Sequence, residues 1–142
     1  MTGKIQWIAL LLLLSFTALT IAMEIDLSGF ELNDSEWWVE DIEGRGVLDR
    51  SHTSLQFSAN GKVSGDTACN RYHGTVTAVG NNIRFGPLAG TRRACAPALM
   101  DQEMKFYLAV EKVTSWEVPA SGLLHLRAVD GNTVIRAWRV ED

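Results

Sequence analysis

The chain has 142 residues, of which 46% are hydrophobic and 21% are charged, and its formal net charge is −4. This length suits one domain with one modest core and argues against a second domain, and no repeat or low-complexity segment appears. The negative charge argues against a nucleic-acid partner.

Residues 1–22 are predicted to be an export segment, either a signal peptide or an N-terminal membrane anchor. Residues 5–23 form 19 consecutive uncharged and mostly apolar positions, and Lys4 is the single charge before them. About 20 apolar residues can span a bilayer, whereas the small residues up to Ala22 offer a cleavage site. We favour cleavage, because Ser15, Thr17 and Thr20 make the end of the run polar. We expect a location in the periplasm or on the outer face of the cytoplasmic membrane, with membrane contact only through this segment.

Residues 23–34 are predicted to be an acidic tether, followed by one folded domain over residues 35–142. Eight acidic residues and no basic residue occur between positions 24 and 43. A run of like charges is most often a solvated segment rather than a binding site. The folded domain is therefore expected to begin near the first strand.

The first predicted strand covers residues 36–42 and contains the consecutive tryptophans Trp37 and Trp38. Successive side chains of a strand point to opposite faces of a sheet. One of these tryptophans must therefore face outward, where an exposed indole ring can bind a partner.

Two hairpins are expected next. Residues 54–58 alternate between apolar and polar, and Asn60-Gly61, a strong hairpin turn signal, connects them to residues 62–65. Residues 72–79 resume the pattern, and the turn at residues 80–82 returns the chain along residues 83–85.

A helix is predicted over residues 97–113, with Pro97 in its first turn. Its apolar arc is expected to contain Leu99, Met100, Met104, Phe106, Tyr107, Val110 and Val113, with Asp101, Gln102, Lys105 and Lys112 opposite. Glu103 falls inside the apolar arc, so it needs a partner if it is buried.

Three further strands are predicted over residues 114–118, 123–128 and 133–140, separated by glycine-containing turns. The fold class is mainly β with one helix, a β-rich α+β fold. Its expected architecture is a small antiparallel eight-stranded barrel or meander, with the helix capping one opening.

The two cysteines, Cys69 and Cys95, are expected to form a disulfide, because an exported protein folds in an oxidising compartment. A zinc site with His73 and His125 is an alternative, but the spacing fits no standard zinc pattern. A Cys69–His73 nucleophile pair oriented by Asp66 is another, and it requires a reduced Cys69.

A candidate binding patch surrounds the two cysteines. If the disulfide forms, Arg71, Arg92 and Arg93 gather at one end of the domain, where they can receive a carboxylate or phosphate group. We rank an arginine–Glu103 pair above ligand binding, and we expect Asn70 and Thr91 to satisfy backbone groups. The candidate patch consists of Asn70, Arg71, Arg92, Arg93, Glu103 and Trp38.

Several short motifs, taken in order, resemble the META/HslJ domain family. They are F-S-A-N-G-K-V-S-G at residues 57–65, C-N-R-Y-H-G at residues 69–74 and T-R-R-A-C at residues 91–95, followed by a helix with Glu103 and Phe106. The resemblance covers about residues 35–138. It implies a lipocalin-like small barrel with one helix, exported to bacterial envelopes and often anchored as a lipoprotein. No cysteine follows the apolar run in this chain, so lipid attachment is not expected there.

The family resemblance implies roles in heat response or in tolerance of the antibiotic novobiocin, a likeness to secretion pilot proteins, and no established enzymatic reaction. The first hypothesis is therefore a non-enzymatic envelope module, acting as a monomer on unidentified envelope proteins, without cofactor or metal. The alternative is a carrier that holds a small apolar ligand in the barrel or its mouth. An enzyme is disfavoured, because no nucleophile elbow, phosphate loop or paired-carboxylate site is present.

Overall fold

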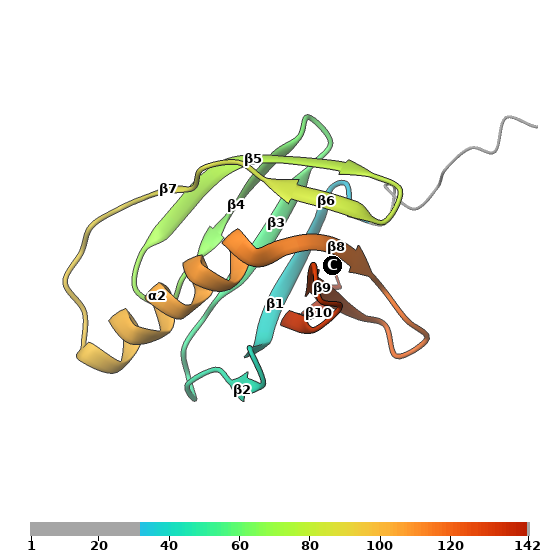
Figure 1. The fold of residues 1–142 in the computed structure, drawn as a ribbon. Coiled ribbons are helices and arrows are strands. Elements are labelled where there is room, and N and C mark those ends of the chain that lie inside the picture. Colours follow the sequence, from blue (N-terminus) through green and yellow to red (C-terminus); the bar gives the residue numbers. More distant parts are fainter. Residues whose placement is uncertain (1–31, 142) are drawn as a thin grey trace, which may run out of the picture.

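The structure, a computed structural model, describes residues 32–141. These residues form a closed antiparallel barrel of eight strands, with two additional short strands and one helix (Figure 1). The predicted export segment and residues 23–31 of the predicted tether lie outside the described residues. Within the described part, the helix is neither long enough nor apolar enough to cross a membrane.

The barrel strands follow one another around the sheet in nearly the order of the sequence. They are β1 (Ser35–Ile42), β3 (Ser54–Ser58), β4 (Lys62–Asp66), β5 (Arg71–Val79), β6 (Asn82–Phe85), β8 (Val113–Glu117), β9 (Leu123–Ala128) and β10 (Thr133–Arg139). The short strands are β2 (Arg45–Gly46) and β7 (Ala89–Gly90), and the helix is α2 (Pro97–Lys112). Pairing of β10 with β1 closes the barrel. The predicted mainly β fold with one helix is confirmed, and the structure adds β2 and β7.

The hairpins form where turn chemistry predicts them. Gly61, at the β3–β4 turn, has a φ of 73°, a left-handed conformation that glycine adopts without steric cost. Gly80 has a φ of 56° at the turn between β5 and β6, whose pairing extends from Val76 opposite Phe85 to Val79 opposite Asn82. Local sequence therefore determines both connections.

Large apolar side chains fill the interior of the barrel. Trp37 is 1% exposed, whereas its neighbour Trp38 is 37% exposed on the outer face, so the prediction that one tryptophan faces outward is confirmed. Other fully buried side chains are Leu55, Val63, Phe106, Leu124, Leu126 and Ile135. The interior is a packed core, which weighs against a ligand held inside the barrel.

The helix begins at Pro97, as predicted, but part of its predicted apolar arc is wrong. Met100 and Met104 are exposed, and Gln102, expected on the solvent side, is buried. Gln102 accepts a hydrogen bond from the backbone N–H of Leu48 at 2.8 Å and donates to Thr53 Oγ1 at 3.1 Å. These bonds satisfy the buried amide, which explains why a polar residue lies on the inner face.

The fold also extends beyond the predicted start of the domain at Ser35. Leu32 is 3% exposed and belongs to the core. Asp34, with a φ of 51°, accepts a hydrogen bond from the backbone N–H of Ala59. Leu32, near the end of the predicted tether, therefore packs into the core, whereas Asn33 and Asp34 are exposed.

Candidate functional site

The disulfide lies at the centre of the predicted site. Cys69 and Cys95 are bonded, with an S–S distance of 2.10 Å and a Cα–Cα distance of 5.9 Å. The bond connects the turn between β4 and β5 to the segment that leads into α2. A cross-link between residues 26 apart contributes about 3 kcal/mol in the chain-entropy account. The predicted disulfide is confirmed, and its main effect is to fix these two segments together.

Asn70, beside the disulfide, is 3% exposed and uses its whole side chain within the protein. Its carbonyl oxygen accepts hydrogen bonds from Thr91 Oγ1 at 2.8 Å and from the backbone N–H of Arg93 at 2.7 Å. Its Nδ2 group donates to Glu103 Oε1 at 3.1 Å. Asn70 and Thr91 therefore have the structural role predicted for them, and Asn70 is unavailable for a ligand.

Glu103 has different partners from those we hypothesised. Its carboxylate accepts hydrogen bonds from Asn70 Nδ2 and from the hydroxyl group of Thr67. None of the ion pairs found within residues 32–141 includes Glu103. The arginine–Glu103 pair is therefore wrong, because neutral donors of the β4–β5 turn reach the carboxylate instead.

The three arginines of the predicted patch do not form one cluster. Arg93 donates from its guanidinium group to the carbonyl oxygen of Cys69 at 2.7 Å. Arg71 lies 3.6 Å from the carboxylate of Asp66 on the outer face. Arg92 lines a separate groove together with Glu103. Arg93 therefore has a structural role, Arg71 lies on the outer face, and Arg92 lines the groove.

The groove lies between α2 and the segment that includes the end of β6 and β7, and it has a volume of about 370 Å³. Phe85, Leu88 and Val110 contribute apolar lining, and Arg92 and Glu103 contribute charge. Tyr107 also lines it, and partial burial, followed by the nearby negative charge of Glu103, raises the pKa of its hydroxyl group. The groove therefore has both apolar and ionic character.

Trp38 belongs to a row of side chains on the outer face that sequence reasoning only partly identified. Its ring centroid is 4.9 Å from that of Trp138 on β10 and 4.4 Å from that of His52. His52 Nε2 is 3.9 Å from Asp66, which in turn neighbours Arg71. The row links two members of the predicted patch. Sequence reasoning missed Trp138 and His52 because they join it through the register of β1 with β10 and through a loop.

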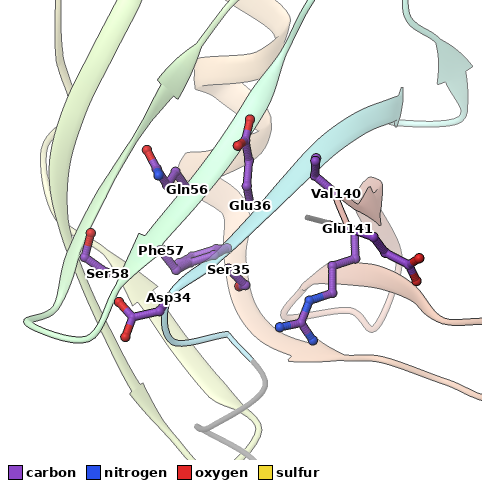
Figure 2. Close-up of a pocket in the computed structure, with 9 residues that line it drawn as sticks. Asp34, Ser35, Glu36, Gln56, Phe57, Ser58, Val140 and Glu141 are labelled. Atoms are coloured by element: carbon purple, nitrogen blue, oxygen red, sulfur yellow. The ribbon is translucent and has the colours of Figure 1, made fainter.

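The hollow in Figure 2 adjoins this row and has a volume of about 590 Å³. In the figure, Glu36 and Gln56 project to the same side of the neighbouring strands β1 and β3. Trp38 Nε1 donates to Glu36 Oε1 at 3.1 Å, which connects the hollow to the aromatic row. The remaining lining residues are Asp34, Ser35, Phe57, Ser58, Arg139, Val140 and Glu141.

The disulfide argues against both alternative roles of the cysteines, the zinc site and the Cys69–His73 nucleophile pair. Both sulfur atoms are consumed by the disulfide, so Cys69 cannot act as the proposed nucleophile with His73. The four candidate zinc ligands are not brought together, since no group of three His, Cys, Asp or Glu side chains in residues 32–141 is arranged to hold a metal ion. The features that remain are the groove beside α2 and the aromatic row on the outer face.

Comparison with solved structures supports the fold. An NMR structure of a protein from Burkholderia xenovorans is 25% identical with a TM-score of 0.65, and the match covers 82% of this chain and 89% of that one. A second NMR structure is 22% identical with a TM-score of 0.60, covering 76% and 92%. A crystal structure of a DUF4847 family protein from Bacteroides vulgatus is 15% identical with a TM-score of 0.57, covering 78% and 96%. These last two show a shared fold alone.

The sequence comparisons agree with this structural similarity. No curated protein matches the chain. A model of the META domain matches residues 30–141, which include the whole of the described barrel. The match starts before Ser35, in agreement with the burial of Leu32. The chain belongs to the META domain family.

Proposed function

We propose that this protein is a non-enzymatic module of the cell envelope that binds another envelope protein through the outer face of its barrel. The observation that carries the proposal is the pair of exposed tryptophans, Trp38 and Trp138, above a core that is already filled. Aromatic side chains are enriched at the centres of protein interfaces.

Polar and charged side chains surround Trp38 and Trp138, as they do at the rim of a protein–protein interface. His52, Asp66 and Arg71 extend the row on one side, and Glu36 accepts a hydrogen bond from Trp38. These groups are partly exposed and charged or polar, as expected around a buried aromatic centre. A protein partner that covers both indole rings would remove their apolar surface from water at about 25 cal/mol per Å².

The cellular setting of the proposal comes from the leader and from the family. An apolar segment at residues 5–23 is typical of export, and a disulfide persists in an oxidising compartment. The family resemblance adds envelope stress or antibiotic tolerance as the process served. The packed interior favours this function over that of a carrier that encloses an apolar ligand.

Site-specific photocrosslinking tests the proposal. A photoreactive amino acid at position 38 of the full chain, expressed in its own envelope, should crosslink to one protein, which mass spectrometry identifies. The purified partner should then bind the wild-type chain, and Trp38→Ala and Trp138→Ala should each weaken its affinity about tenfold or more.

Val129 provides the control, because it is 90% exposed in the turn between β9 and β10, away from the row. A photoreactive amino acid at position 129 should give no such crosslink, and Val129→Ala should leave the affinity unchanged. Equal crosslinking from both positions, or unchanged affinity in the two tryptophan variants, would reject the outer-face site.

A further inference from the structure

The barrel is nearly open along one seam, between β6 and β8. These two strands pair through a single residue pair, Asn82 opposite Ser115. Every other pair of neighbouring barrel strands is held by three to five residue pairs. Within the part of the chain that the structure describes, Arg84 and Phe85 therefore have no strand partner on this side of β6.

The reason for the open seam is that the chain preceding β8 is helical. Figure 1 shows α2 running directly into β8, beside β6. Extending the register of Asn82 and Ser115 would place residue 111 opposite residue 86, but residue 111 lies in the last turn of α2. The seam consequently widens into the groove between α2 and the segment from Phe85 to Arg92.

The dimensions of this groove suit a short extended peptide. One wall is the stretch of α2 from Glu103 to Glu111, whose ends are eight residues apart and therefore about 12 Å apart at 1.5 Å per residue. An extended chain advances about 3.3 Å per residue, so this wall faces about four peptide residues. The opposite wall includes the unpaired end of β6, whose backbone can hydrogen-bond to an added strand.

Charged and apolar side chains line different parts of the groove, so an extended peptide in it would have one preferred direction. Arg92 and Glu103 lie toward one end, since residue 91 contacts Asn70, which in turn bonds Glu103. Glu111 lies at the other end of the helical wall, and Leu88 and Val110 line the apolar part. Neither Arg92 nor Glu111 belongs to an ion pair within residues 32–141.

We propose that this groove binds the extended C-terminal segment of another protein, which adds as a strand to the free edge of β6. Its terminal carboxylate pairs with the guanidinium group of Arg92, an arrangement that favours two parallel hydrogen bonds. An apolar side chain packs against Leu88 and Val110, and a basic group about four residues before the terminus lies near Glu111. The site shares no residue with the row of Trp38 and Trp138 and is tested independently of it.

NMR spectroscopy and fluorescence anisotropy on the full chain test this proposal. The probe is a labelled pool of pentapeptides with lysine at the first position, an apolar residue at the third and a free terminal carboxylate. We expect amide resonance shifts at Arg84, Phe85 and along the inner side of α2. The same pool with an amidated C-terminus should bind about tenfold more weakly or worse, because the charge-assisted pair with Arg92 is lost.

Variants of two arginines provide the matched comparison. Arg92→Ala should weaken binding of the carboxylate pool about tenfold and abolish the difference between the two pools. Arg45→Ala should leave both affinities unchanged, because Arg45 is exposed on β2 and does not line the groove. Absence of binding, equal binding of both pools, full affinity in Arg92→Ala, or resonance shifts confined to other surfaces would each overturn the proposal.

Discussion

The side-chain amide of Asn70 donates a hydrogen bond of 3.1 Å to the carboxylate of Glu103, 33 residues further along the chain. Through this bond the turn between β4 and β5 holds the helix that covers one side of the barrel. The same asparagine holds Thr91 and the backbone of Arg93, so a single side chain joins three segments.

Replacing Asn70 should therefore be among the most destabilising polar substitutions. Asn70→Ala leaves the partly buried N–H of Arg93 and the hydroxyl of Thr91 without their acceptor, and we expect a loss of about 2–4 kcal/mol in the free energy of unfolding. Urea denaturation followed by tryptophan fluorescence measures it. Asn33→Ala, at an exposed position, should change stability by less than about 0.5 kcal/mol. Similar midpoints for the two variants would contradict the role given to Asn70.

The disulfide should contribute stability without being needed for the fold. The double variant Cys69→Ala, Cys95→Ala removes the cross-link and leaves no free thiol, and we expect a loss of about 3 kcal/mol. Calorimetry of wild type and variant measures the difference, and the far-ultraviolet circular dichroism of the variant should remain that of the barrel. If both proteins melt at the same temperature, the cross-link does not stabilise the domain.

Truncation of the two consecutive tryptophans should destabilise the protein by very different amounts. Trp37→Ala empties a core position that is 1% exposed and should cost about 3–5 kcal/mol. Trp38→Ala removes an outer-face ring and its contacts with Trp138 and His52, and should cost about 1 kcal/mol or less. Chemical denaturation of both variants tests the contrast. A large loss in Trp38→Ala would show that the outer pair serves mainly to hold β1 to β10.

Alkaline pH should destabilise the domain through two tyrosines. Burial is the main cause that raises the pKa of Tyr72 well above its ordinary value, and burial also raises that of Tyr107. A raised pKa in the folded state favours the neutral phenol, so this contribution to stability is complete below about pH 10 and decreases as pH rises further. Melting temperatures measured from neutral pH to beyond the titration of free tyrosine should decline only in the alkaline range.

A phenylalanine variant separates ionisation of Tyr72 from its packing. Tyr72→Phe loses the hydrogen bond of 2.8 Å to the carbonyl oxygen of Ser54, which should cost about 1 kcal/mol near neutral pH. The variant should then decline less steeply at alkaline pH than the wild type does. An equally steep decline would assign the alkaline transition to other groups.

The sequence predicted the features that depend on neighbouring residues. Asn60-Gly61 specifies the hairpin between β3 and β4, Pro97 marks the start of α2, and strand alternation places one of Trp37 and Trp38 outside. The eight barrel strands follow from such local signals. Each depends on contacts within a few residues, which is the range over which a sequence pattern carries direct information.

The parts that the sequence did not predict depend on contacts between distant segments. Gln102 is buried because its amide reaches Leu48, 54 residues away, and this interaction overrides the helical wheel. Glu103 bonds Asn70 and Thr67 rather than an arginine because the disulfide brings that turn to the helix. The seam between β6 and β8 likewise arises from where α2 ends, and strand patterns do not encode it.

Closure of the barrel by β1 and β10 has a consequence for how the protein is made. The final strand bonds to β9 on one side and to β1 on the other, so two ladders form only after the chain has been synthesised as far as Arg139. Until then a nascent chain carries bare edges on β1 and β9, which are templates for aggregation. A chain whose synthesis stops before β10 therefore cannot close the barrel, and it keeps both of these edges exposed.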